Sequence, residues 1–480
     1  MIAGLKPYPA MKDSGVPWLG DVPEHWEVRK LRHVLDRVTD RNQPDLPLLS
    51  VVREKGVIQR DTTSKDENHN FIPDDLSNYK VVRVGQFAMN KMKAWQGSYG
   101  VSHHDGIVSP AYFVFDVNGV EGEFFHAAIR SKTYVPFFTQ ASDGVRIGQW
   151  DLSQARMKET PFCAPPGSEQ SAIVHFLDHA DRRIQRYIRT KQKLIKLLEE
   201  QKQAIIHHAV TRGLDPSVRL KPSGVEWLGD VPAHWEVWQI GHFAAIGNGS
   251  TPSRGNTSYW SDGTYPWLNS SSVNAGSIVA SDQLVTDSAL RECHLPRVPA
   301  GSVLVAITGQ GKTRGRAAVL MIEATINQHI AFITPRKHDR IATSEYLQKF
   351  LGAAYSELRR MSDDSGSTKG ALTCEDLRHF RVALPPIDEQ HQIVGWVKDA
   401  TTEVESALQF AEREICLLRE YRTRLIADVV TGKLDVREAA AKLPDASEEP
   451  GPLDDAEAVA ERENDPESED LDAVSEEAET

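Results

Sequence analysis

The stretch SGVPWLGDVPEHWEV at residues 14–28 returns almost unchanged as SGVEWLGDVPAHWEV at residues 223–237, with 13 of 15 positions identical. A second motif, Pro-Pro-x-x-Glu-Gln, begins at Pro165 and again at Pro385. A Val-Thr pair follows each of these motifs at the same distance, at Val210 and at Val430. Because whole motifs recur in the same order, the chain is expected to contain one structural unit twice.

The segments between these motifs, residues 38–160 and 246–380, are unlike each other. Both contain short apolar runs bounded by Gly, Pro, Asn or Asp, which are typical of strands. A helical pattern of apolar residues predicts a helix at residues 344–360. The chain should therefore run twice through a repeated piece, a variable mixed α/β piece and a helix, with pseudo-two-fold symmetry. Strands are predicted at residues 81–84, 112–115, 302–307 and 330–333.

Each Pro-Pro-x-x-Glu-Gln motif opens a long heptad pattern. Proline disfavours a helix start before it, and Ser168 and Asp388 are expected as N-caps. Apolar residues then recur at alternating steps of four and three, as in a coiled coil. Helices of about 40 residues are roughly 60 Å long, and two on one chain are expected to pair in antiparallel fashion. The predicted seams are Ile173, Leu177, Ala180, Ile184, Tyr187, Lys191, Leu194, Leu198, Gln201, Ile205 and His208, and Ile393, Val397, Ala400, Val404, Ala407, Ala411, Glu414, Leu418, Tyr421, Leu425 and Asp428.

The predicted fold class is α+β, with two globular mixed α/β domains joined by two long helices that form an antiparallel coiled coil. The expected domains span residues 12–163 and 213–383. The expected helices span residues 164–212 and 384–442, and a tail follows at residues 443–480.

The formal net charge of the 480 residues is −13, which at face value argues against a nucleic-acid partner. The charge is uneven, however. Residues 443–480 contain 16 acidic residues and a single basic one, Arg462, so their net charge is −15 and residues 1–442 carry +2. The tail contains no aromatic residue and is predicted to be disordered. We interpret it as a solubilising tail or as a competitor for the basic surface of the protein itself.

The expected location is the cytoplasm. The sequence has no apolar stretch of about 18 residues and no basic flank and apolar run of a secretory signal. Its four cysteines, Cys163, Cys293, Cys374 and Cys416, are isolated from one another. This spacing excludes a zinc ribbon and a disulfide framework, and it suits a reducing compartment.

Motifs for catalysis are incomplete. Gly309 to Thr313 ends like a phosphate-binding loop, but the first glycine of that loop is replaced by Ala306. Ser109 to Tyr112 resembles the Pro-Pro-Tyr turn of DNA methyltransferases, but Ala111 replaces one proline and no glycine-rich cofactor strand precedes it. We therefore expect no catalytic residue, no metal site and no directly bound cofactor in this chain.

Polar and basic loops remain as the candidate binding residues. Arg and Lys suit phosphates and guanine edges, Asn and Gln suit adenine, and Gly allows close approach of the backbone. The candidate DNA-binding residues are Lys91, Lys93, Trp95, Gln96, Ser98 and Arg146 in the first variable segment, and Ser250, Arg254, Asn269, Gln310, Lys312, Arg314, Arg316, Asn327, Gln328 and Lys369 in the second.

The arrangement resembles the specificity (S) subunit of type I restriction–modification systems over residues 12–440. The resemblance is carried by the repeated Trp-containing block, by the Pro-Pro-x-x-Glu-Gln helix openings and by the stretch from Ile246 to Pro252. It also rests on Asn327-Gln328 and on Ser365 to Thr368. The first variable segment departs from the pattern, since residues 37–40 read Arg-Val-Thr-Asp where a Gly-x-Thr-Pro entry would stand.

The resemblance implies a prokaryotic, non-catalytic subunit whose two target-recognition domains read the unequal halves of a bipartite site in double-stranded DNA. It implies two methyltransferase (M) subunits and restriction/translocase (R) subunits as partners. S-adenosylmethionine, ATP and Mg²⁺ would then act in those partners. Half-sites one helical turn apart require domain faces separated by roughly 34 Å, which helices of this length can span. Expected partner-binding residues are Trp18, Trp26, Trp227 and Trp235 of the repeated blocks.

Two alternatives remain open from the sequence. One is a stand-alone fused restriction or methylation enzyme whose motifs have degenerated. The other is a coiled-coil scaffold without a role in DNA binding.

Overall fold

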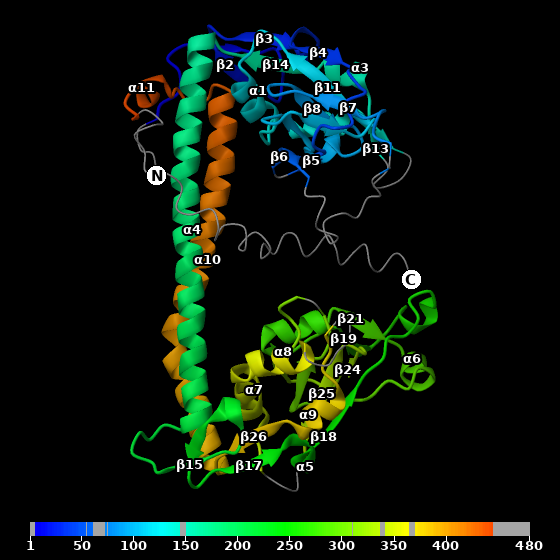
Figure 1. Cartoon of the computed structure of the whole chain (residues 1–480), viewed down its shortest axis with the longest axis vertical. Coiled ribbons are helices and arrows are strands. Elements are labelled where there is room, and N and C mark those ends of the chain that lie inside the picture. The colour runs from blue at the N-terminus through cyan, green and yellow to red at the C-terminus, as the bar shows by residue number, and fades with distance from the viewer. Residues whose placement is uncertain are drawn as a thin grey trace. The chain divides into compact units, whose positions relative to one another are not determined.

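The computed structural model describes residues 5–53, 55–60, 73, 75–144, 150–309, 311–336, 341–363 and 370–444 (Figure 1). The chain divides into two compact units. Unit 1 comprises Met1–Arg189 and Ile415–Thr480, and unit 2 comprises Thr190–Glu414. Two long helices, α4 (Gly167–Arg212) and α10 (Ile387–Val430), contribute residues to both units.

Unit 1 contains a four-stranded sheet of order β4-β11-β8-β9, whose neighbouring strands are all antiparallel, together with several two-stranded sheets. Its elements are β1 (Met11–Asp13), β2 (Asp21–Pro23), β3 (Glu27–Lys30), β4 (Leu35–Val38), β5 (Leu49–Val52), β6 (Gly56–Gln59), β7 (Lys80–Val82), β8 (Phe87–Asn90), β9 (Tyr99–Val101), β10 (Gly106–Val108), β11 (Tyr112–Val117), α1 (Gly122–Ile129), α2 (Val135–Gln140), β12 (Ser142–Gly144), β13 (Trp150–Leu152), α3 (Gln154–Lys158), β14 (Pro161–Ala164) and α11 (Arg437–Ala440).

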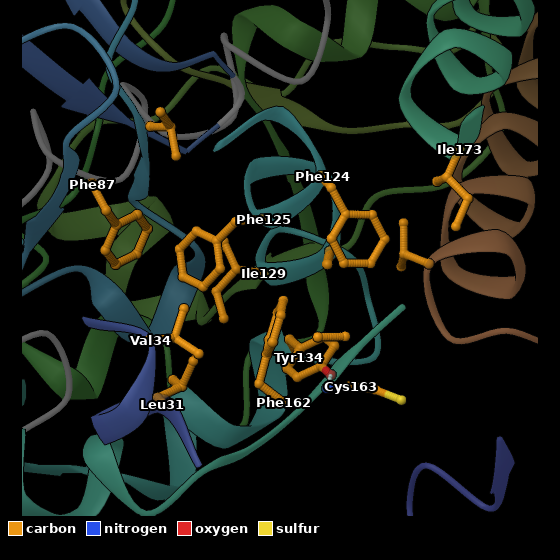
Figure 2. Packing of buried hydrophobic residues seen from close by; sticks show 14 of the residues in the cluster. Leu31, Val34, Phe87, Phe124, Phe125, Ile129, Tyr134, Phe162, Cys163 and Ile173 are labelled. Atoms are coloured by element: carbon orange, nitrogen blue, oxygen red, sulfur yellow. Dashed lines mark hydrogen bonds between the residues drawn. The ribbon is translucent and has the colours of Figure 1, made fainter. Parts of the chain in front are cut away.

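The core of unit 1 is aromatic. Phe124 and Phe125 of α1 are fully buried and meet Phe162 of β14, with ring centroids 6.3 and 5.2 Å apart. Figure 2 shows Phe125 facing the sheet side of this core and Phe124 facing Ile173 of α4. Edge-to-face and tilted pairs of this kind add to the free energy of burying the rings. The same apolar cluster therefore joins the sheet, α1 and the first turns of α4.

Unit 2 contains a five-stranded sheet of order β18-β25-β22-β23-β20 and a three-stranded sheet of order β21-β19-β24. Its elements are β15 (Leu220–Pro222), β16 (Asp230–Pro232), β17 (Glu236–Gln239), α5 (Ile240–Phe243), β18 (Ala244–Asn248), β19 (Tyr265–Leu268), β20 (Ser277–Ile278), β21 (Gln283–Val285), α6 (Asp287–Glu292), β22 (Ser302–Ala306), β23 (Ala317–Leu320), β24 (Thr325–Ile326), β25 (Ile330–Pro335), α7 (Ser344–Ala353), α8 (Tyr355–Asp363), α9 (Cys374–His379) and β26 (Arg381–Leu384).

Each unit contains its own copy of a frame built from the repeated motifs. In unit 1, β3 pairs with β14, and in unit 2, β17 pairs with β26, both in antiparallel register. Each pair joins the strand that begins at the end of a Trp-containing block to the strand before a Pro-Pro motif. The sheets carried by this frame differ in strand number and order, which confirms that the variable segments are mixed α/β pieces of different design.

The helices run antiparallel within each unit. In unit 1 the start of α4 and the end of α10 share one apolar cluster, and Arg422 bonds Asp181 between them. In unit 2 the end of α4 shares a cluster with the start of α10, and Lys202 lies 2.7 Å from the carboxylate of Glu405.

The predicted heptad seam is correct at the start of α4 and wrong further along. Ile173 and Ile184 are buried, but Tyr187 is 52% exposed and Leu194 is 40% exposed, while Ile188 is buried in place of Tyr187. Near the helix end, Ile206 and Ala209 are buried instead of Ile205 and His208. A straight helix has 3.6 residues per turn, so a strict 3.5-residue seam rotates away from its partner. In α10 the predicted Ala407 and Asp428 miss the seam by one residue in the same way.

Other local predictions were mostly correct. The four predicted strands are found as β7, β11, β22 and β25. The predicted helix at 344–360 is interrupted at Ala354, which is the C-cap of α7, so it forms two helices. Helices α4 and α10 begin before Ser168 and Asp388, so these residues lie in the first turn and are not the N-caps.

Among the described residues, no helix is both long enough and apolar enough to cross a membrane. The acidic tail predicted from residue 443 lies, apart from Leu443 and Pro444, outside the described residues.

Candidate functional site

The repeated Trp-containing block of unit 1 is hydrogen-bonded to the first turn of α4. The Trp26 indole is fully buried and donates through Nε1 to Glu169 Oε1 at 2.9 Å, while His25 Nε2 lies 2.7 Å from Glu169 Oε2. The turn that follows α10 reaches the same place at Gly432, whose φ is +75°. A Cβ at Gly432 would lie 2.3 Å from Pro23 Cδ, so only glycine fits there.

Unit 2 has the same arrangement, but here the first turn of α10 takes the place of the first turn of α4. Trp235 donates to Glu389 Oε1 at 3.0 Å, and His234 Nε2 lies 2.8 Å from Glu389 Oε2. Here α10 begins, and the chain after α4 passes at Gly213, where a Cβ would meet the Trp235 ring at 3.3 Å. The Glu of each Pro-Pro-x-x-Glu-Gln motif is therefore the acceptor for the Trp and His of the repeated block.

The Gln of each motif fixes the domain to the helix. Gln170 donates to the Pro165 carbonyl at 2.7 Å and accepts from the backbone N–H of Glu121 at 2.6 Å. Gln390 donates to the Pro385 carbonyl at 2.9 Å and accepts from the backbone N–H of Thr343 at 2.8 Å. Both amides are buried and bonded to the backbone on both sides, so they are structural.

The four tryptophans predicted to bind partners are placed in two ways. Trp26 and Trp235 are 0% exposed, so their side chains cannot themselves touch a partner in this structure. Trp18 and Trp227 are half-buried. Trp18 packs on Tyr134 and Phe137, with its ring centroid 3.7 Å from that of Phe137, while Trp227 packs on Phe350 and Phe380.

Three loops of unit 2 gather many of the predicted DNA-binding residues. Gly249 lets the loop that begins at Ser250 lie against β24, because a Cβ there would meet the Ile326 carbonyl oxygen at 1.7 Å. Thr251 Oγ1 donates to Gln328 Oε1 at 2.5 Å, and the His329 ring bonds Thr308 Oγ1 at 2.6 Å. The Gly-Ser-Thr-Pro loop, the Asn-Gln turn and the loop after β22 therefore meet at one exposed place.

Arg254 is held in position at the rim of these loops. Its guanidinium lies 4.0 Å from the centroid of the Trp260 ring and 5.1 Å from that of Trp267, and it donates to Gln283 Oε1 at 2.8 Å. The same two indoles donate to the Ser253 and Ser250 carbonyls, which anchors the loop. A guanidinium that is exposed and stacked on indole rings loses little freedom when it contacts an anion or a base.

Three predicted residues of this second segment have structural roles. Asn327 is 5% exposed, and its side chain accepts from the backbone N–H of His329. Arg314 is 4% exposed and bonds Asp363. Asn269 caps a short helical turn by accepting from the backbone N–H of Ser271. Asn327 and Arg314 are both buried, which argues against direct contact with DNA through their side chains.

Lys312 and Arg316 flank Arg314 and are exposed. The Lys312 carbonyl accepts from Tyr355, and Arg316 donates to Asn274 at 3.4 Å. The bonds to Lys312 and Arg316 shape the loop without neutralising either charge, so the two cations remain suited to phosphate.

Removing these two charges should lower the salt dependence of DNA binding. We expect the double variant Lys312→Ala/Arg316→Ala to reduce the slope of log K against log salt by about 1–2, because each phosphate contact contributes about 0.9. Binding titrations between low and moderate salt measure this slope. The matched variant Arg314→Ala should instead lower the melting temperature, and an unchanged slope in the double variant would exclude the phosphate contacts.

The candidate residues of unit 1 lie around the turn after β8. Lys91 is paired with Asp151 at 2.9 Å, Lys93 is exposed, and Trp95 packs on Trp150 with ring centroids 5.8 Å apart. Ser98 is 2% exposed, which argues against a direct contact through its side chain. Lys93 and the Trp95–Trp150 pair are therefore the surface features that this turn offers.

Gln96 lines a hollow of about 280 Å³ that sequence reasoning missed. Arg53, Arg130 and Lys132 also line it, and Arg130 donates to the Tyr99 and Arg53 carbonyls at 2.5 and 2.7 Å. Burial, together with the charge of Arg130, lowers the pKa of His126 to about 4, so this neighbouring imidazole is neutral at physiological pH. Arg53 lies far from Arg130 and Lys132 in the sequence, which is why no local motif indicated the hollow.

Arg146, Gln310 and Lys369, which were also predicted to bind DNA, lie outside the described residues. The residues that sequence reasoning missed in unit 2 are Thr308 and His329. His329 directly follows the Asn-Gln pair, but its role depends on Thr308 from another strand end, and that contact leaves no signal in the sequence.

Each unit therefore combines the same repeated frame with a different set of basic and amide-rich loops, and such side chains suit contacts with phosphates and base edges. Residues 232–409 match a family model described as the type I restriction modification DNA specificity domain. The chain is 22% identical over 283 residues to the EcoR124I/EcoR124II specificity subunit of Escherichia coli, a match that covers 58% of this chain and 64% of that protein.

A second relative is assigned as the specificity subunit of the type I restriction enzyme MjaX of Methanocaldococcus jannaschii. It is 21% identical over 87% of this chain and 96% of its own length. A solved structure from work on complex assembly and conformational transition of a type I system matches 86% of this chain and 99% of its own, with a TM-score of 0.59 and 18% identity, which shows the fold. These findings agree with the predicted family: residues 232–409 match its DNA specificity domain, and the chain is similar to type I restriction enzyme specificity subunits over most of its length.

Proposed function

We propose that this chain is the non-catalytic subunit that reads a bipartite DNA site, with each unit reading one of two unequal halves. The observation that carries the proposal is the contrast within the molecule. The Trp-His-Glu contacts and the frame strands are the same in both units, whereas the sheets and loops mounted on them differ. One scaffold with two different variable surfaces suits a site with two different halves.

The long helices are proposed to form the coiled-coil spacer that sets the distance between the half-sites. Helix α4 has 46 residues and α10 has 44, which corresponds to lengths of roughly 65–70 Å. Both helices also expose large apolar side chains, which favour docking of another helix. These are Tyr187 and Leu417 in unit 1, and Leu194, Leu197, Trp396 and Phe410 in unit 2.

The proposed occupants of these helix faces are two methyltransferase subunits, and restriction/translocase subunits would join that core. Trp18 and Trp227, which are only half-buried, are proposed to lie at the edges of the same contacts. S-adenosylmethionine, ATP and Mg²⁺ would bind in the partner subunits, since the catalytic motifs of this chain are incomplete. The proposed location is the prokaryotic cytoplasm.

The test is an exchange of the second variable segment. Residues 246–380 are replaced by the equivalent segment of a relative, and the chimera is combined with the methyltransferase subunit. The methylated sequences are then mapped and compared with those of the unaltered chain. We expect the second half-site to change completely and the first half-site to stay the same. An unchanged second half-site would contradict the proposal.

The purified unaltered chain also distinguishes this function from a stand-alone enzyme and from a scaffold without a role in DNA binding. Methylation by the purified chain and S-adenosylmethionine without a partner would indicate a stand-alone enzyme. Absence of sequence-specific binding, even with the methyltransferase subunit, would indicate a scaffold without a role in DNA recognition.

A further inference from the structure

The turn between β24 and β25 holds Gln328 in a fixed place. Its backbone is tied to three neighbours: Asn327 N–H donates to the Leu268 carbonyl at 3.0 Å, Ser250 N–H to the Ile326 carbonyl at 3.0 Å, and Ile307 N–H to the His329 carbonyl at 2.9 Å. Gln328 is exposed, whereas Asn327 beside it is buried. The turn is therefore an anchored support for one exposed amide.

A chain of hydrogen bonds also holds this amide between Thr251 and His329. Thr251 donates to Gln328 Oε1 at 2.5 Å, and Gln328 Nε2 lies 3.1 Å from His329 Nε2. An amide nitrogen can only donate, so His329 Nε2 must accept. The imidazole proton is then on Nδ1 and is donated to Thr308 Oγ1 at 2.6 Å.

Only half of the hydrogen-bonding capacity of the Gln328 amide is occupied by Thr251 and His329. A primary amide has two oxygen lone pairs and two N–H groups. Thr251 occupies one lone pair and His329 accepts one N–H, so one acceptor and one donor are left. In the major groove, adenine alone among the bases offers a matching acceptor and donor, N7 and N6–H, to one side chain, whereas guanine offers two acceptors.

We propose that Gln328 reads one adenine of the second half-site through both groups, and that Thr251 and His329 are positioning residues that set its donor–acceptor order. The inference rests on the proposed function, because it assumes that unit 2 faces the major groove. It goes further in naming the base, the reading atoms and the residues that orient them. Lys312 and Arg316, in contrast, are proposed to contact phosphate and carry no base preference.

The first test replaces Gln328 by glutamate in the full chain. A carboxylate has nearly the same shape but offers only acceptors, and acceptors suit the N4–H of cytosine. The Gln328→Glu variant, the methyltransferase subunit and S-adenosylmethionine are incubated with a plasmid library of randomised sequence, and N6-methyladenine is mapped. We expect one adenine of the second half-site to lose about 5- to 100-fold of its preference, and cytosine to gain at that position.

The second test addresses the positioning role of His329. His329→Leu removes the acceptor for Gln328 Nε2, so the amide can turn over and its base preference should weaken at that same position. His329→Gln offers a side-chain oxygen in its place and should restore most of the preference. A residue with a merely structural role would lower methylation at all sites equally and would not distinguish these two variants.

Each outcome decides between the claims. The first half-site, which unit 1 reads, reports in the same experiment whether a variant is folded and assembled. If the segment exchange changes the second half-site but Gln328→Glu leaves every base preference as it was, the adenine reading is wrong and the proposed function stands. If the exchange itself changes nothing, the proposed function fails first. Loss of preference at one position with the first half-site intact supports the proposal.

Discussion

Replacing Trp26 by alanine is expected to lower the free energy of unfolding of unit 1 by about 3–5 kcal/mol. The indole is fully buried, packs edge-to-face on Phe124 with ring centroids 6.4 Å apart, and donates to Glu169. It also lies against Gly432, so it joins the N-terminal block to the start of one long helix and the end of the other. The alanine variant would leave a large cavity at the point where three distant segments meet.

Hydrogen exchange measured by mass spectrometry on the full chain can localise this loss. Peptides from α1 and β14 of unit 1 should lose protection in Trp26→Ala, while peptides from β22 and α7 of unit 2 should keep it. The matched variant Trp235→Ala should give the reverse pattern, because Trp235 occupies the same place in unit 2. Equal loss of protection throughout both units in both variants would show that these residues do not act within their own units.

Replacing Glu169 by alanine should cost about 2–5 kcal/mol, because two buried donors lose their acceptor at once. Trp26 Nε1 and Tyr8 Oη both donate to Glu169 Oε1, at 2.9 and 2.5 Å. Burial and the neighbouring Glu169 carboxylate raise the pKa of Tyr8, so this phenol remains protonated and needs an acceptor. Denaturant unfolding of the variant and of the unaltered chain measures the difference.

Glu389→Ala is the matched control. Glu389 accepts from Trp235 and His234 in the same way, but its side chain is 24% exposed against 5% for Glu169, and water can replace part of what it provides. We therefore expect a cost nearer to 1–2 kcal/mol. A Glu389 variant that loses as much stability as the Glu169 variant would contradict this difference between the two units.

The frame of the fold could be predicted because its motifs occur twice in the sequence. The repeated Trp-containing block and the Pro-Pro-x-x-Glu-Gln motif each recur, and both copies of each meet in the structure through the Trp–Glu bond. The role of Glu169 and Glu389 was nevertheless not predicted, since an acidic residue in a first helical turn is adequately explained by the helix dipole. Only the folded chain brings Trp26 to a residue 143 positions away.

The seam of the helices was predicted less well than their existence. The heptad pattern located both helices, but burial beyond Ile184 follows the 3.6-residue period of a straight helix. Tyr187 and Leu194, which the pattern placed inside, are therefore partly exposed, and they became candidates for partner contact.

The binding loops were located but not resolved by the sequence. Residue type and loop composition indicated Arg254 and Gln328 correctly as exposed polar groups, yet they equally indicated Ser98, Arg314 and Asn327, which are buried. Whether a polar side chain in a loop faces solvent depends on contacts such as Arg314 with Asp363, which join separate segments. The orientation of the Gln328 amide depends on Thr251 and His329 in the same way.

The central claim is that two unlike variable units on one scaffold read two unequal DNA half-sites. The most direct measurement maps N6-methyladenine on a randomised plasmid library treated with the unaltered chain, the proposed methyltransferase partner and S-adenosylmethionine. The account predicts two specified blocks of different sequence separated by a gap of unspecified bases. A single uninterrupted block, a symmetric site with identical halves, or methylation without sequence preference would contradict it.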